Sequence, residues 1–175
     1  MKLHKLPILF LFLCFQANAA QTYTIAIVDV VQPNTLQIMD SAKRVMQVSL
    51  AALDFPPASP QLNKNAIKRL KTLTLGKQAQ LQLTPRKTAL VSVSGLQLNT
   101  RLLAEGLAVI NTVAIRELPK TLQKTMFQSQ QQARQNKLGF WSGQSVAEVQ
   151  KYYAPYWAEQ KIPAPLTRAP VYHPQ

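Results

Sequence analysis

The chain has 175 residues, of which 47% are hydrophobic and 15% charged; this is enough apolar material to bury a core, and it excludes disorder of the whole chain. Twenty Lys and Arg against seven Asp and Glu give a net charge of +13, which favours an anionic partner such as nucleic acid or membrane headgroups. With one cysteine and two histidines, the composition excludes an internal disulfide and a His/Cys zinc site.

Residues 1–19 have the pattern of a signal peptide. A basic beginning is followed by the apolar run Ile8–Phe15 and by the small-x-small cleavage signal Ala17-Asn18-Ala19. The run is too short for a transmembrane anchor, which needs about 20 residues. Acylation of Cys14 is disfavoured because the large Leu13 precedes it. We therefore expect an exported protein, periplasmic or extracellular, with no transmembrane anchor after cleavage.

The first half of the mature chain predicts a strand meander followed by a helix. Apolar alternation predicts strands over Tyr23–Val31, Thr35–Met39 and Val45–Leu53, separated by polar turns. Ser59-Pro60 then provides an N-cap followed by proline at the first helical position, and the helix is expected to end near Gly76. The lysines of this helix are expected to form a solvated face.

The second half predicts two strands and two helices. Strands over residues 79–83 and 89–93 flank the basic connection Thr84-Pro85-Arg86-Lys87. A short helix over Asn99–Glu105 and a longer one over Leu118–Leu138 follow. Five strands with a helix after the third indicate an α+β fold, a five-stranded Greek-key barrel of the OB type with about three helices.

The chain is expected to divide into the signal peptide, one domain over residues 20–141 and a C-terminal part over residues 142–175. That last part is expected to hold an interrupted helix over residues 146–160 and an extended or disordered, Pro- and Tyr-rich tail. Its clustered aromatic side chains suit either a protein interface or packing on the barrel. The cluster consists of Tyr152, Tyr153, Tyr156 and Trp157.

The motifs Val30–Thr35, Leu53–Pro56, Leu98–Ala108 and Gln132–Trp141 follow one another along the chain. In this order they make residues 23–141 resemble the staphylococcal nuclease-like, or thermonuclease, family. The resemblance implies the OB barrel already indicated by the strand order. The third and fourth motifs are architectural, with Gly106 capping a helix and Trp141 expected to pack in the core or at its rim rather than stack on a base.

The resemblance also implies a chemistry. Enzymes of the family hydrolyse phosphodiester bonds with one calcium ion held by two aspartates, a glutamate that activates water and two arginines that bind the phosphate. A hard cation prefers anionic oxygens, and guanidinium groups stabilise the charge that develops on the phosphate. Two of these positions match here: Asp54 takes the place of the second metal aspartate, and Arg86 that of the second phosphate arginine.

Three positions depart from the family pattern. Asn34 replaces the first metal aspartate and supplies an amide oxygen without charge, so calcium affinity should drop. Ser49 stands where the first arginine is expected, and Pro57 stands where the glutamate is expected and cannot accept a proton from water. Losing a general base typically costs about 10²- to 10⁴-fold in rate. Whether the chain is an enzyme is therefore left open.

The leading hypothesis is an exported thermonuclease-like domain, impaired in catalysis, that uses Arg86 and Lys87 to bind nucleic acid or another polyanion. The first alternative is an active calcium-dependent DNA or RNA endonuclease, and the second an envelope protein-interaction module. No cofactor is expected, apart from weak calcium binding at Asp54 and Asn34. Plainer interpretations also remain open: Asp54 hydrogen-bonding its own turn, and Arg86 simply solvated.

Overall fold

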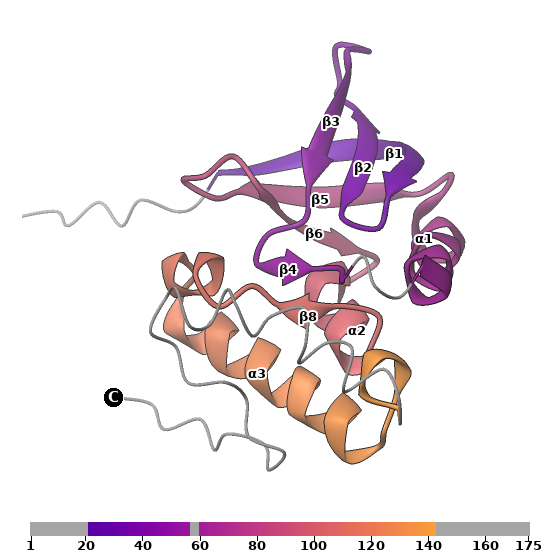
Figure 1. Ribbon diagram of the computed structural model, residues 1–175. Helices are drawn as coiled ribbons and strands as arrows, with labels where there is room; N and C mark the ends of the chain where they lie inside the picture. The colour runs from indigo at the N-terminus through magenta and orange to yellow at the C-terminus, as the bar shows by residue number, and fades with distance from the viewer. Residues whose placement is uncertain (1–20, 57–59, 143–175) are drawn as a thin grey trace, which may run out of the picture.

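The computed structural model describes residues 21–56 and 60–142 (Figure 1). Several predicted features lie outside the described residues. They are the signal peptide, Pro57, the N-cap Ser59, and the C-terminal helix, tail and aromatic cluster. Among the described residues, no helix has the length and hydrophobicity needed to cross a membrane.

All five predicted strands are present and form one antiparallel sheet with a short sixth strand. The order across the sheet is β3-β2-β1-β5-β6-β7, with β3 at one edge. In β2 the buried side chains of Leu36 and Ile38 alternate with half-exposed ones, because successive side chains of a strand point to opposite faces. The strands are β1 (Thr22–Gln32), β2 (Thr35–Met39), β3 (Val45–Ser49), β5 (Gln78–Leu83), β6 (Ala89–Val93) and β7 (Leu96–Gln97).

The predicted third strand, Val45–Leu53, extends four residues beyond the observed β3. Strand β3 ends at Ser49 because the chain turns at Ala52, whose φ of 56° lies in the left-handed region. Beyond this turn, β4 (Leu53–Asp54) pairs with β8 (Val109–Ile110) in a separate two-stranded sheet. The turn thus places the segment that carries Asp54 against the second half of the chain.

The segment after β3 joins the large sheet to its other side. Leu50 forms a parallel bridge with Ala89 at the start of β6, and the Ala51 N–H donates to the Ala89 carbonyl at 2.7 Å. The buried Asn99 donates to the carbonyls of Ala51 (2.9 Å) and Ala89 (3.1 Å) and accepts from the Val91 N–H (3.2 Å). These bonds bring β3 and β6 together as in the predicted OB-type barrel.

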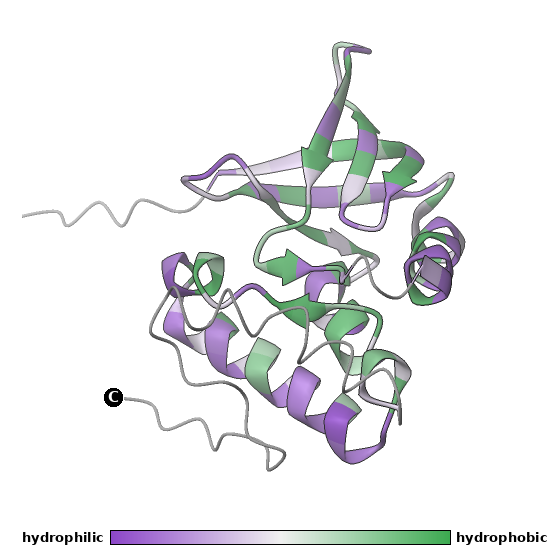
Figure 2. Cartoon of the chain, in the orientation of Figure 1, coloured by the Kyte–Doolittle hydropathy of each residue, from purple (hydrophilic) through white to green (hydrophobic). Residues whose placement is uncertain are grey.

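Three α-helices complete the fold, as predicted: α1 (Pro60–Thr74), α2 (Leu98–Ala104) and α3 (Lys120–Gln135). Helix α3 buries Met126 and Ala133, and α1 buries Ala66 and Leu70. Figure 2 shows hydrophobic residues over β8 and α2, which lie between the barrel and α3. The core therefore continues from the barrel into the contact between α2 and α3.

Gly106 caps the C-terminal end of helix α2 in a Schellman motif, as the sequence predicts. The Gly106 N–H donates to Leu103 O (3.0 Å) and the Leu107 N–H to Leu102 O (2.9 Å), while Gly106 has a φ of 66°. The Gly106 carbonyl accepts from the Phe140 N–H at 2.8 Å. This bond belongs to a close backbone crossing between Gly106 and the segment Leu138–Phe140.

Trp141 packs inside the fold, at 5% exposure. The guanidinium of Arg134 lies over its ring, 4.8 Å from the centroid, in cation–π geometry. A ring covered in this way is not available to stack on a nucleobase, which agrees with the packing role expected for it.

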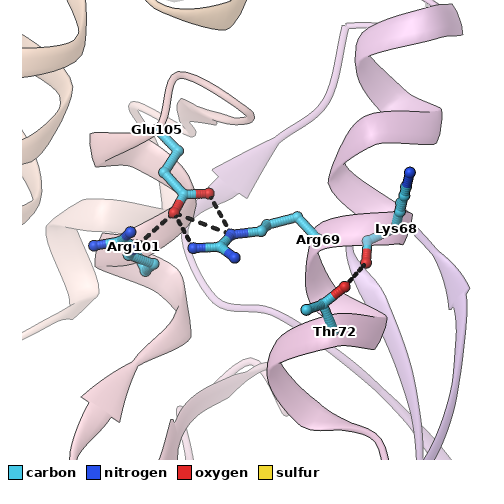
Figure 3. A network of polar contacts seen from close by, with 5 residues as sticks. All are labelled: Lys68, Arg69, Thr72, Arg101 and Glu105. Atoms are coloured by element: carbon cyan, nitrogen blue, oxygen red, sulfur yellow. Dashed lines mark hydrogen bonds and ion pairs between the residues drawn. The ribbon is translucent and has the colours of Figure 1, made fainter.

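Glu105 connects α1 to α2 through two arginines (Figure 3). Its carboxylate accepts from Arg69 on α1 through both Nε and Nη2, the shortest contact being 2.7 Å, and from Arg101 on its own helix. Burial favours the neutral acid and raises the pKa of Glu105, but the hydrogen bonds from Arg69 and Arg101 outweigh it, so the pKa lies below its usual value.

This arrangement predicts an acid-sensitive contribution to stability. Because the pKa of Glu105 is lower in the folded state, its contribution is complete above the unfolded-state pKa and disappears as the pH falls through the folded-state pKa. Glu105→Gln is expected to cost about 1 kcal/mol at neutral pH, a value limited by the partial exposure of both arginines. Urea denaturation at a series of pH values should show the two curves converging below about pH 4. Parallel curves would contradict this role.

Candidate functional site

Asn34 and Ser49 come together at one end of the meander. Asn34 lies in the β1–β2 turn, where its backbone carbonyl accepts from the Leu50 N–H at 2.7 Å. Thr35, the next residue, is paired with Ser49 in the sheet. The amide oxygen of Asn34 accepts from the Thr35 hydroxyl at 2.9 Å. The side chain of Asn34 is thus held by its own turn.

Asp54 is half-buried on β4 and is linked to the loop after β8. The Asn111 amide nitrogen donates to Asp54 Oδ1 at 3.1 Å. The amide oxygen of Asn111 accepts from the N–H groups of Val113 (3.1 Å) and Ala114 (2.8 Å), at the beginning of the 3-10 helix η1 (Ala114–Glu117). Asp54 therefore accepts a hydrogen bond from a residue 57 positions away in the chain.

Arg86 lies in the exposed β5–β6 turn. The Thr84 and Thr88 hydroxyls meet across this turn at 2.8 Å, and the Lys87 N–H donates to Thr84 O at 2.9 Å. Arg86 Nε donates to a carboxylate oxygen of Glu117, the last residue of η1. The plain expectation of a solvated Arg86 is thus incomplete, because this guanidinium has an acidic partner.

Contacts of the fold link the segments that carry the described candidate residues Asn34, Ser49, Asp54, Arg86 and Lys87. Asn34 is bonded to Leu50, next to Ser49, and Leu50 is bridged to Ala89, three residues after Arg86. Asn111, the partner of Asp54, lies three residues before helix η1, and Glu117, the partner of Arg86, is the last residue of that helix. The remaining candidate, Pro57, lies outside the described residues.

Comparison with known families agrees with this geometry. The family model described as staphylococcal nuclease homologue (SNase) matches residues 24–143. The chain belongs to the SNase family. This confirms the resemblance drawn from the four motifs and agrees with the OB-type fold predicted from the order of strands and helices. A search of curated proteins found no significant match.

The donor set of this SNase domain does not fit a calcium ion well. Calcium takes 6–8 oxygen ligands, several of them carboxylates. Here the predicted positions offer one carboxylate, Asp54, which already accepts from Asn111, and one amide oxygen, that of Asn34, which accepts from Thr35. Within residues 21–56 and 60–142, no three His, Cys, Asp or Glu side chains gather as metal ligands.

Sequence reasoning missed two residues of this region, Asn111 and Glu117. Asn111 contacts Asp54, and Glu117 contacts Arg86 from 31 positions away. Neither lies in one of the four motifs that carry the family resemblance. Glu117 is a carboxylate that the fold, not the local sequence, brings to the phosphate-arginine position.

Most described carboxylates of the SNase domain are committed to cations. Asp29 pairs with Lys71 at 2.9 Å, and this hydrogen bond lowers the pKa of Asp29. Asp40, Glu105 and Glu117 pair with arginines. Several exposed cations in the described part of the chain form no ion pair with a described carboxylate, and among them Lys87, Arg116 and Lys120 lie within three positions of Arg86 or Glu117 in the sequence. We call these three residues the basic rim.

Proposed function

We propose that the protein is an exported SNase-domain protein that binds nucleic acid through its phosphates and has lost efficient calcium-dependent hydrolysis. The observation that carries the proposal is the basic rim, whose members lie close to Arg86 or Glu117 in the chain. Lys87 follows Arg86 and Arg116 precedes its partner Glu117, so each partner of the Arg86–Glu117 contact has an exposed cation next to it in the sequence. Export rests on the signal pattern of residues 1–19.

Loss of turnover is supported by the residues at the expected catalytic positions. Ser49 cannot replace a guanidinium at the phosphate, and Pro57 carries no base. Removing an arginine that stabilises a phosphoryl transition state can cost about 10³- to 10⁵-fold in rate. Binding needs neither group, because cations alone attract phosphates.

Nucleic acid is favoured over other polyanions by the SNase family membership and by the charge. The full chain carries a net charge of +13, and the described acids are largely neutralised by partners of their own. A phosphodiester backbone provides the regularly spaced negative charges that such a surface attracts.

The test is binding of a fluorescent single-stranded DNA, followed by anisotropy in the presence of chelator. Affinity is expected to fall about 10- to 100-fold between about 50 and about 300 mM salt, since each neutralised phosphate releases counterions. The double variant Lys87→Gln/Arg116→Gln should weaken binding about 5- to 10-fold at low salt. Lys64→Gln/Lys68→Gln on α1, with the same loss of charge, should weaken it much less.

Three results would contradict the proposal. The first is absence of binding at low salt, and the second is binding that does not respond to salt. The third is calcium-dependent cleavage of the same DNA that Asp54→Ala abolishes, which would establish the nuclease alternative. Tighter binding of long-chain polyphosphate than of DNA would assign a different polyanion to the surface.

Export is tested separately. Mass spectrometry of the purified protein identifies its N-terminal residue, which shows whether the signal peptide has been removed.

A further inference from the structure

The contact between Arg86 and Glu117 joins two separate elements. Arg86 comes from the β5–β6 turn and Glu117 from the end of η1, and Arg86 Nε donates to Glu117 Oε1. The side chains are 55% and 28% exposed, respectively. The pair therefore lies at the surface, where a dissolved anion can reach the same guanidinium.

A carboxylate and a phosphodiester present the same recognition chemistry to an arginine. Each offers two oxygens that share negative charge and accept hydrogen bonds from the planar guanidinium fork. While Glu117 accepts from Nε, that edge of the fork is occupied and the charge of Arg86 is locally neutralised. A phosphate that is to bind Arg86 through this edge must displace Glu117.

Both partners are held in position by contacts of their own elements. In η1, Ile115 is 2% and the following Leu118 5% exposed, and the Ile115 N–H donates to Asn111 O at 3.0 Å. The β5–β6 turn is closed by the Thr84–Thr88 hydroxyl contact. Little backbone freedom is lost when the pair forms, so Glu117 is a preorganised competitor.

We propose that Glu117 is an internal phosphate mimic that occupies Arg86 and limits the affinity of this surface for nucleic acid. The proposal rests on the proposed nucleic-acid binding and adds a residue that sets its strength. Binding through Arg86 then requires exchange of one anion for another, whereas Lys87 and Arg116 of the basic rim bind without such exchange.

The decisive variant is Glu117→Gln, which keeps the size of the side chain and removes its charge. Affinity for single-stranded DNA at about 50 mM salt is expected to rise about 3- to 10-fold. The variant removes both the repulsion between the Glu117 carboxylate and the DNA phosphates and the competition for Arg86. Asp40→Asn is the matched control, because it also removes one negative charge from an exposed arginine pair, at the β2–β3 turn. It should raise affinity by less than about 2-fold.

A double-mutant cycle assigns the gain to Arg86. In an Arg86→Gln background, Glu117→Gln should change the affinity for DNA by less than about 2-fold, because the guanidinium for which Glu117 and the phosphate compete is then absent. Thermal unfolding of each variant checks that it folds. If Glu117→Gln does not fold, Glu117→Asp, which shortens the reach by one methylene, should give a smaller gain in the same direction.

The outcomes separate this inference from the proposed function. If the unaltered protein binds no DNA at low salt, the proposed function fails. If it binds DNA and Glu117→Gln behaves like Asp40→Asn, the pair is only a structural link and the inference is overturned. A gain that persists in the Arg86→Gln background also overturns it, because Glu117 would then act on other cations.

Discussion

Gly106→Ala is expected to lower the free energy of unfolding by about 3 to 5 kcal/mol, the sum of a left-handed backbone penalty and a backbone clash. A Cβ at this position would lie 2.2 Å from the carbonyl oxygen and 2.6 Å from the carbonyl carbon of Leu138. Because these are main-chain atoms, no side-chain rotation relieves the contact. The measurement is urea denaturation of both proteins.

Gly95→Ala separates the two contributions. Gly95 has a φ of 79°, yet its Cβ would meet no atom within 4 Å. It should therefore show only the conformational penalty, about 1 to 2 kcal/mol. If Gly106→Ala costs no more than Gly95→Ala, the crossing between Gly106 and Leu138–Phe140 is not a tight one in solution.

Asn99→Ala is expected to cost about 2 to 4 kcal/mol. Asn99 is fully buried, and its truncation removes the donor to Ala51 O and the acceptor of the Val91 N–H. The Ala89 carbonyl would keep a partner, the Ala51 N–H. The cost thus comes mainly from two buried polar groups and from a cavity, and chemical denaturation measures it.

Asn65→Ala on α1 is the control for this substitution. Asn65 is exposed and accepts one hydrogen bond from Gln61. Its replacement should change the free energy of unfolding by less than about 0.5 kcal/mol. A cost for Asn99→Ala as small as this would show that water or rearranged backbone replaces the buried amide.

The sequence could predict the elements in which a periodic pattern of apolar side chains extends over five or more consecutive residues. The alternation in Thr35–Met39 and the apolar stripe of α1 contain their own signal, so both were placed correctly. The pairing of β4 with β8 carries no such signal, because each strand has only two residues and the paired residues are 57 and 55 positions apart. The turn at Ala52 was missed because alanine rarely adopts a positive φ.

The candidate site was predictable only as a set of positions. Resemblance to the family indicated where Asn34, Ser49, Asp54 and Arg86 belong, and the structure shows backbone bonds that draw their segments together. Their roles stay predictions. The partners Asn111 and Glu117 depend on how η1 docks, which is a tertiary property that no local pattern in residues 111–117 specifies.

The Asn99 network also implies an order of events during synthesis. The hydrogen bond from Asn99 to Ala51 spans 48 residues, whereas the β1–β2 and β2–β3 hairpins pair neighbouring segments. Local hairpins form without the entropic penalty of closing a long loop, so the meander can assemble first on a growing chain. The contacts of Leu50 and Ala51 with Ala89 need residue 89 and the bonds of Asn99 need residue 99, so the buried side chains of Val48 and Val91 are expected to be fully covered only late in synthesis.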